Sequence, residues 1–216
     1  MSTQHAEDWE LLWKNGINPG ERFDIGTSHL ILQKFLKEGK IPATGNALIP
    51  GCGRGYDVAL LACDSKRSVI GLDMSSTCVE ESNKYLQTVL TPEASAKVLC
   101  EDFFEHQGNY SFVYDYTFFC AILPSRRIEW ASKMSSLIVK GGYLLTLQFP
   151  LSHYGTIHPK DQPLDYTRGP PFLLTKSMYD DLLLQNFEKI EEDNVPEEMS
   201  EVRRRNVEAF AFWKRK

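Results

Sequence analysis

Leu48-Ile49-Pro50-Gly51-Cys52-Gly53-Arg54-Gly55-Tyr56-Asp57 is an apolar run that breaks into three alternating glycines. Glycine reaches positive φ and has no Cβ, so Gly51 and Gly53 can bring backbone amides close against a ligand. The next apolar run, Val69-Ile70-Gly71-Leu72-Asp73, closes with an acid that lies 20 residues after Gly53. In dinucleotide-binding domains the acid that binds the ribose hydroxyls lies about 20 residues beyond the glycine turn. The two runs therefore predict a nucleoside-binding α/β domain in which Asp73 accepts the ribose hydroxyls.

The glycine spacing narrows the choice of nucleoside. A dinucleotide fingerprint is G-x-G-x-x-G, in which the third glycine lets the helix approach the strand beneath a pyrophosphate. Here the order is G-x-G-x-G. S-adenosylmethionine has a ribose and an amino acid but no phosphate, so it fits this bend better than a nicotinamide dinucleotide does.

Composition bounds the class of protein. With 216 residues, 42% hydrophobic and 25% charged, the chain has the size of one domain, and we expect a single domain over residues 1–216. The net charge of -5 argues against a nucleic-acid partner, which normally meets a patch of Lys and Arg. The basic run Arg203-Arg204-Arg205 is short, and we interpret it as a solvated strand edge rather than an RNA contact.

The expected cellular location and oligomeric state follow from two patterns that the sequence lacks. No apolar segment approaches the ~20 residues of a membrane span, and residues 1–8 do not resemble a signal peptide. We expect a cytoplasmic monomer with no membrane partner, and a nuclear location stays open.

Five cysteines are scattered along the chain without a C-x-x-C pair. An odd count without a signal peptide predicts reduced thiols, and neither a disulfide framework nor a zinc site. His153 and His158 lie near Asp161 and Asp165, but they lack the i, i+4 spacing that places two imidazoles on one helix face. No metal site is therefore predicted.

Apolar runs alternate with helical patterns along most of the chain. Strands are expected at residues 47–50, 68–73, 96–101, 112–118, 143–149, 187–191 and 207–213, and helices at 26–37, 56–63, 76–90, 124–139 and 175–184. Repeated strand–helix units predict a parallel sheet that binds its ligand at the carboxyl ends of the strands, and the last two strands would form an antiparallel edge. Residues 151–171 are rich in proline and have no period, and we interpret them as a lid.

Five segments with distinctive residues follow one another in the chain. They are Trp9-x-x-x-Trp13, Ile49-Pro50-Gly51-Cys52-Gly53, Val69-Ile70-Gly71-Leu72-Asp73, Tyr114-Asp115-Tyr116-Thr117-Phe118-Phe119-Cys120-Ala121-Ile122 and Arg168-Gly169-Pro170-Pro171-Phe172. Together they resemble the thiopurine methyltransferase superfamily, and within it the thiol and halide methyltransferase branch. The resemblance implies a Rossmann-like α/β fold with a seven-stranded sheet, mostly parallel with an antiparallel C-terminal edge strand, and an N-terminal helical cover at residues 1–40. It also implies methyl transfer from S-adenosylmethionine to a small soft nucleophile, a thiol or sulfide before a halide.

The resemblance assigns donor-binding roles to aromatic residues near the N-terminus. Trp9, Trp13 and Phe23 would turn aromatic faces toward the sulfonium cation of the donor. For the two tryptophans, a helix that packs its i, i+4 pair on the core is the alternative.

Three further donor contacts follow from the same resemblance. Asp102 would accept the adenine amino group, with Glu101 as the competing acid, while the Phe103 amide meets the ring. Tyr116 would contact the methionyl group, and a half-buried sheet aromatic is the alternative for this residue.

The methyl acceptor would be held by positive charge. Arg127 and Arg168 are the candidates for holding an anion in a pocket that Tyr116 also lines, and a surface salt bridge is the alternative for each arginine. Because the donor already carries a good leaving group, direct transfer needs no catalytic residue, and Cys120 is interpreted as an inert, mostly buried thiol. An O- or N-methyltransferase of a small natural product is an alternative function, and a nonenzymatic S-adenosylmethionine-binding module is another.

Overall fold

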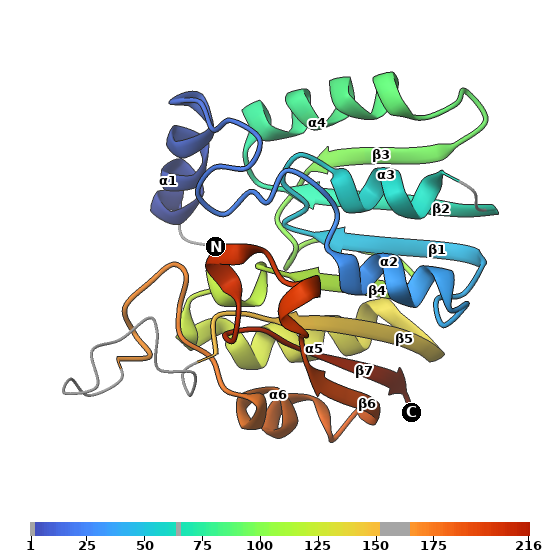
Figure 1. Cartoon of the computed structure of the whole chain (residues 1–216), viewed down its shortest axis with the longest axis vertical. Helices are drawn as coiled ribbons and strands as arrows, with labels where there is room; N and C mark the ends of the chain where they lie inside the picture. Colours follow the sequence, from blue (N-terminus) through green and yellow to red (C-terminus); the bar gives the residue numbers. More distant parts are fainter. Residues whose placement is uncertain (1–2, 64–65, 152–164) are drawn as a thin grey trace. The chain divides into compact units, whose positions relative to one another are not determined.

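The computed structural model describes residues 3–63, 66–151 and 165–216. Within these ranges the chain forms a seven-stranded sheet of order β3-β2-β1-β4-β5-β7-β6 (Figure 1). The chain divides into two compact units, Met1–Val113 and Tyr114–Lys216, and a single domain over residues 1–216 stays a prediction. Most of the lid expected at residues 151–171 lies outside the described residues. None of the described helices has the length and hydropathy needed to cross a membrane.

The sheet of the first unit is parallel. Its strands are β1 (Thr44–Pro50), β2 (Lys66–Asp73), β3 (Ser95–Cys100) and the beginning of β4 (Tyr110–Tyr116). β2 pairs in parallel with β1 and β3, and β4 pairs in parallel with β1. The second half of β1 is buried without a break, as expected for a parallel strand that is covered on both faces. These pairings confirm the strand–helix units expected from the sequence.

The helices of the first unit are α1 (Thr3–Lys14), α2 (Leu30–Lys37), α3 (Tyr56–Ala62) and α4 (Ser76–Val89). Side chains cap the starts of α2 and α4. The expected start of a helix at Gly26 is wrong, because Gly26 has a φ of +73° and His29 Nδ1 caps α2 by accepting the Ile31 N–H at 3.1 Å. Ser75 caps α4 by accepting the Cys78 N–H at 3.0 Å.

The second unit contains the antiparallel edge of the sheet. Its elements are α5 (Arg127–Leu137), β5 (Ile138–Gln148), α6 (Lys176–Leu183), β6 (Phe187–Asn194) and β7 (Ala209–Arg215). β7 pairs antiparallel with both β5 and β6. The antiparallel C-terminal edge predicted from the sequence is thus confirmed.

The helix expected at residues 124–139 is shorter in the structure. Residues Pro124–Arg126 form a 3₁₀ turn before α5, and β5 begins directly after α5, at Ile138. Gly141, with a φ of +78°, lies inside β5 and does not end the helix. The β-branched pair Ile138 and Val139 favours an extended backbone, which accounts for the early change to a strand.

Candidate functional site

A glycine bend follows the carboxyl end of β1. Gly51 and Gly53 have φ values of +59° and +51°, in the left-handed region that disfavours other residues. The Cys52 N–H donates to the Leu72 carbonyl at 2.9 Å, which ties the bend to the end of β2. The bend therefore presents backbone at the sheet edge where the sequence predicts a nucleoside.

Gly71 lets the bend and α3 lie directly on β2. A Cβ at Gly71 would lie 2.6 Å from the Cys52 sulfur and 2.9 Å from a Val58 methyl group. Both distances are far shorter than van der Waals contacts, so a larger residue would displace the bend. This glycine of the apolar run, for which the sequence suggested no role, fixes the position of the bend.

Asp73 joins two turns at the end of β2. Its Oδ2 accepts the Gly53 N–H at 3.2 Å, and its Oδ1 accepts the Ser75 N–H at 3.0 Å. A carboxylate has roughly four acceptor sites, so two bonds leave acceptor capacity for ribose hydroxyls. Burial raises the pKa of Asp73 above its ordinary value. The side chain thus fits the role predicted for it, and its contact with the ribose stays a prediction.

The three aromatic residues predicted to meet the sulfonium lie together. The ring centroids of Trp9 and Phe23 are 5.4 Å apart, and those of Trp13 and Phe23 are 6.0 Å apart. Trp13 is only 3% exposed and packs against Ile17. Its ring lies 3.8 Å from the position of a Cβ on Gly53. The cluster therefore adjoins the glycine bend, and in this structure Trp13 is a core residue.

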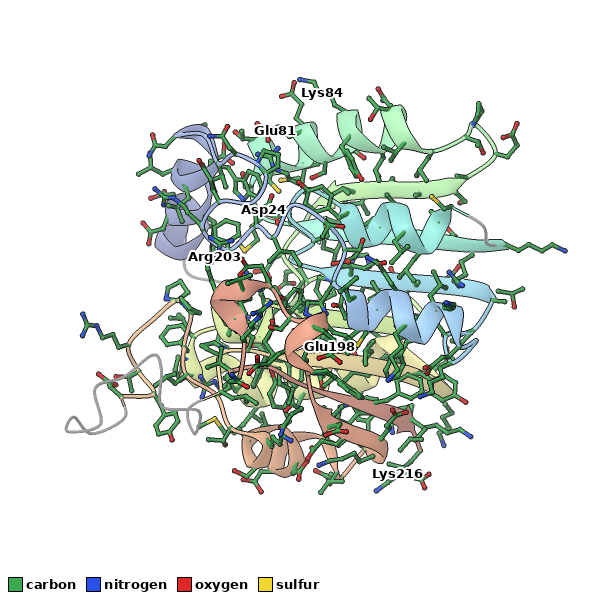
Figure 2. The ribbon with its side chains drawn as sticks, in the orientation of Figure 1. Asp24, Glu81, Lys84, Glu198, Arg203 and Lys216 are labelled. Atoms are coloured by element: carbon green, nitrogen blue, oxygen red, sulfur yellow. The ribbon has the colours of Figure 1, made fainter. Side chains whose placement is uncertain are left out.

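Arg54, within the glycine bend, holds the segment that carries Phe23. Its guanidinium lies 5.3 Å from the Trp13 ring centroid and donates to the Ile17 carbonyl. Two carboxylates labelled in Figure 2 pair with it, Asp24 at 3.0 Å and Glu81 at 2.9 Å. Because one cation joins all these groups, the aromatic cluster is fixed relative to the bend.

Glu10, which the sequence analysis did not single out, attaches α1 to the N-terminus of α4. Its carboxylate accepts hydrogen bonds from the hydroxyls of Ser75 at 2.6 Å and Thr77 at 2.8 Å, and from the Thr77 N–H at 3.3 Å. Burial raises its pKa, but these hydrogen bonds outweigh burial and lower the pKa from 4.5 to about 2. A negative charge at a helix N-terminus is also favoured by the helix dipole. Glu10 therefore positions the helix that carries Trp9 and Trp13.

We expect Glu10→Gln to lower the free energy of unfolding at pH 7 by about 1 kcal/mol, the usual size of a lost helix cap. The lowered pKa means that the stabilisation is complete above pH 4.5 and is lost as the pH falls toward about 2. Urea denaturation of wild type and Glu10→Gln should show that the difference in their free energies of unfolding becomes smaller as the pH falls through this range. Glu7→Gln, on the exposed side of the same helix, is the control. A difference that stays constant with pH would contradict this role of Glu10.

The residues expected at the adenine ring form a tight turn after β3. Asp102 Oδ1 accepts the Phe104 N–H at 3.0 Å, and Phe103 is buried with its ring 5.3 Å from that of Phe104. The competing acid, Glu101, lies 2.6 Å from His106 Nδ1. Because Glu101 is occupied by a histidine, Asp102 is the better candidate for the adenine amino group.

Tyr116, at the end of β4, belongs to a buried polar network in the second unit. Its hydroxyl donates to Glu208 at 2.8 Å and accepts from Arg204, while Glu208 also accepts from Ser200 at 2.5 Å. Burial raises the pKa of Tyr116 well above 10; the charge of Arg204 opposes this rise and the charge of Glu208 adds to it. The interpretation of Arg203-Arg204-Arg205 as a solvated edge is wrong for Arg204, which is 3% exposed, because its guanidinium packs on aromatic rings.

Arg127 is a buried cation at the start of α5. It is 9% exposed, and its Nε and Nη2 are buried without a hydrogen-bond partner within residues 3–63, 66–151 and 165–216. Its Nη1 contacts the Met178 sulfur at 3.5 Å, and its guanidinium lies 5.5 Å from the Phe119 ring centroid. Burial lowers its pKa. The expected alternative of a surface salt bridge does not describe this residue, since no carboxylate in the described part of the chain pairs with it.

The remaining acceptor candidate has a different environment. Arg168 is exposed, beside Asp165, so a pocket role for it stays a prediction. Within residues 3–63, 66–151 and 165–216 there is no cluster of metal-ligating side chains. His153, His158 and Asp161 lie outside the described residues.

Three thiols near these groups have raised pKa values, and of these Cys78 and Cys120 are buried while Cys52 is half-buried. Burial, followed by the charge of Asp73, raises the pKa of Cys52 in the bend and of Cys78 in the first turn of α4. Burial also raises the pKa of Cys120 to about 12, which agrees with the inert thiol predicted there.

Comparison with known proteins shows which family the chain belongs to. Residues 4–216 match the family model of thiopurine S-methyltransferase. The chain belongs to the thiopurine S-methyltransferase family. It is 36% identical to "Probable thiol methyltransferase 2" of Arabidopsis thaliana over 100% of this chain and 88% of the relative. It is 31% identical to "Thiocyanate methyltransferase 1" of Brassica oleracea over 96% of this chain and 84% of the relative.

Solved structures share the fold of this family member. A structure titled as the conversion of a disulfide bond into a thioacetal group in echinomycin biosynthesis has a TM-score of 0.72, 17% identity and coverage of 98% of this chain and 92% of the other. A TehB-like SAM-dependent methyltransferase from Corynebacterium glutamicum has a TM-score of 0.60, 12% identity and coverage of 99% of both chains. Family membership confirms the prediction of an S-adenosylmethionine-dependent methyltransferase, and these neighbours confirm its fold class.

Two features of this methyltransferase had no usable pattern in the sequence. The Ser75-Ser76-Thr77 run could have indicated an acid at the N-terminus of α4, but nothing local identifies Glu10, 65 residues earlier. The burial of Arg204 was hidden because arginines flank it on both sides.

Proposed function

We propose that this methyltransferase transfers the methyl group of S-adenosylmethionine to the sulfur of a small thiol or sulfide. The observation that carries the proposal is Arg127, a buried guanidinium whose Nε and Nη2 have no hydrogen-bond partner among the described residues. A buried cation without a counter-ion is costly, and an anionic ligand would remove that cost. A thiolate is such an anion, and it is the reactive form of a thiol.

The donor would be held by residues of the first unit. Gly51 and Gly53 offer backbone that no Cβ covers, Asp73 has acceptor capacity for the ribose, and Trp9, Trp13 and Phe23 are gathered beside the bend. Asp102 and Phe103 would meet the adenine. These residues fit a nucleoside that carries a cation, because an aromatic face attracts a cation by ~0.5 to 2 kcal/mol.

The reaction would be a direct in-line displacement. When bound, S-adenosylmethionine supplies an electrophilic methyl group and a neutral thioether as leaving group. The thiolate sulfur forms the new bond to the methyl carbon while the carbon–sulfonium bond breaks, so the products are a methyl thioether and S-adenosylhomocysteine. Arg127 would hold the thiolate, and the enzyme needs to align it at about 3 to 3.5 Å from the methyl carbon and exclude water.

Two titratable groups of the second unit are unsuited to act as a general base. The Tyr116 hydroxyl proton is directed to Glu208, and its pKa lies well above 10. Cys120 has a pKa of about 12. We therefore propose that the positive charge of Arg127, with that of Arg168 as a second candidate, favours the ionised form of the thiol substrate, so that no dedicated base is needed.

A panel of acceptors tests the function. Purified protein would be incubated with S-adenosylmethionine and, in separate reactions, hydrosulfide, small aryl thiols, thiocyanate, iodide, arsenite and thiopurines, with methylated product measured directly. We expect kcat/KM for hydrosulfide or aryl thiols to exceed that for iodide. Transfer to oxygen or nitrogen acceptors with none to the thiols would contradict the proposal, as would donor binding without any transfer.

A further inference from the structure

Gln148, the last residue of β5, is a buried side chain whose hydrogen-bonding groups are unused. It is 0% exposed, and in the part of the chain that the structure describes neither its Oε1 nor its Nε2 has a hydrogen-bond partner. Buried polar groups in native proteins are nearly always hydrogen-bonded, and an unsatisfied one costs the full desolvation of that group. A core position at a strand end would be filled more stably by an apolar residue. The amide therefore requires an explanation other than packing.

The pairing of β5 with β7 shows which face of the sheet Gln148 occupies. In the register Thr146 lies opposite Ala211 and Gln148 lies opposite Ala209. The Trp213 indole N–H donates to Thr146 Oγ1 at 3.0 Å, so Thr146 and Trp213 share one face. Since alternate residues of a strand point to the same side, Gln148 shares that face.

Contacts of Lys189 identify this face as the one covered by α6. The Lys189 ammonium lies 5.2 Å from the Trp213 ring centroid and pairs with Asp180 of α6 at 2.5 Å. The face that carries Trp213, Thr146 and Gln148 therefore looks toward α6.

Arg127 contacts the first turn of the same helix. Its Nη1 lies 3.5 Å from the sulfur of Met178. The chain that leaves β5 is joined to the start of α6 as well, because the Leu174 N–H donates to the Pro150 carbonyl at 3.0 Å. The end of β5 and the guanidinium of Arg127 thus both adjoin the beginning of α6. Gln148 and Arg127 are thus two buried side chains in one region of the second unit, and each has polar atoms without a hydrogen-bond partner among the described residues.

We propose that Gln148 is a specificity-determining residue that binds a second polar group of the methyl acceptor while Arg127 holds its thiolate. This inference rests on the proposed thiol methyltransferase function. The side-chain amide of Gln148 can both donate and accept a hydrogen bond. The substrate that matches it is a small thiol with a hydrogen-bond donor and a hydrogen-bond acceptor next to each other, as in a carboxamide. The enzyme would therefore favour carboxamide-bearing thiols over alkyl thiols of similar size.

Gln148→Met tests the inference, because methionine has nearly the same length and no hydrogen-bonding amide. The probes are mercaptoacetamide and propane-1-thiol, each with saturating S-adenosylmethionine. We expect kcat/KM for mercaptoacetamide to fall by about 10- to 100-fold relative to wild type, the range for one or two unmade hydrogen bonds. The value for propane-1-thiol should change by no more than about twofold, since this thiol makes no such bond. Comparing each thiol between variants cancels the difference in acidity between the two thiols.

Thermal unfolding of the ligand-free protein supplies a second readout. Because the amide of Gln148 is unsatisfied, Gln148→Met should raise Tm by about 2 to 4 °C. The matched control is Thr146→Val on the same strand and face, where the hydroxyl does bond to Trp213 and to the Ala211 carbonyl. This control should lower Tm and leave the preference between the two thiols unchanged.

The outcomes separate the two proposals. If wild type methylates both thiols but Gln148→Met keeps the wild-type preference, the role of Gln148 is overturned while the thiol function stands. A fall in Tm as large as that of Thr146→Val would also overturn it, since it would mark Gln148 as a structural residue. If wild type methylates neither these probes nor any other thiol or sulfide, the thiol function itself fails.

Discussion

Asp73→Ala should weaken the binding of S-adenosylmethionine by about 100-fold or more, since a hydrogen bond to a charged group contributes roughly 1.5 to 3 kcal/mol and the ribose offers two hydroxyls. The structure supports this expectation because Asp73 lies at the end of β2 and joins the glycine bend to the start of α4. Isothermal titration calorimetry with S-adenosylmethionine measures the loss. Unchanged affinity in a folded variant would remove Asp73 from the donor site.

Asp73→Asn separates binding from folding. Burial raises the pKa of Asp73, so the folded protein favours the uncharged carboxyl, and the ionised carboxylate detracts from stability as the pH rises above 3.8. A neutral amide of the same shape avoids this penalty but can accept only one of the two backbone N–H groups, so the free energy of unfolding at pH 7 should fall by only about 1 kcal/mol while donor binding is still weakened. Glu80→Gln is a matched control, because Glu80 is an exposed carboxylate on α4 that pairs with Lys84 across one turn. This control should bind the donor as wild type does.

Arg127→Met should lower kcat/KM for thiols by about 100- to 1,000-fold, because it removes the charge proposed to hold the thiolate in a buried site. It should not weaken donor binding, and it should keep or increase stability, since a buried cation without a carboxylate partner is replaced by an apolar side chain. Methyl transfer, calorimetric titration and urea denaturation measure these three effects. Loss of stability in place of activity would show that Arg127 is structural.

Arg126→Met is the matched control for Arg127. Arg126 lies one residue earlier and pairs with Glu129 at 2.7 Å, so it already has its counter-ion. Its replacement should leave thiol methylation near the wild-type rate. The pH profile of kcat offers a further check, because loss of a charge that favours the thiolate should shift the rise of kcat to higher pH in Arg127→Met alone.

Sequence patterns predicted the parts of the fold that depend on local order. The apolar runs that end at Pro50 and Asp73 identified two adjacent parallel strands, because buried strands are continuous in hydrophobicity and glycines mark the turn that follows. The same patterns placed Asp73 and the glycine bend at one sheet edge. They misplaced the starts of α2 and β5, where a histidine cap and a β-branched pair override helical periodicity.

Contacts between distant residues could not be predicted in this way. Glu10 binds α4 across 65 residues, and Arg204 reaches Tyr116 across 88. In each case the burial of a charged side chain depends on partners that the fold brings together. Gln148 was missed for a related reason, because a polar residue at the end of an apolar strand is ordinarily expected to mark the surface.

The raised pKa values of Cys52 and Cys78 affect whether a bound methyl donor can alkylate the protein's own thiols. A sulfonium compound alkylates ionised sulfur, and these two sulfur atoms lie in the glycine bend and in the first turn of the helix that follows Asp73. Burial and the nearby negative charge keep both protonated at physiological pH, and a protonated thiol is a poor nucleophile. The protein is thereby protected from methylating itself.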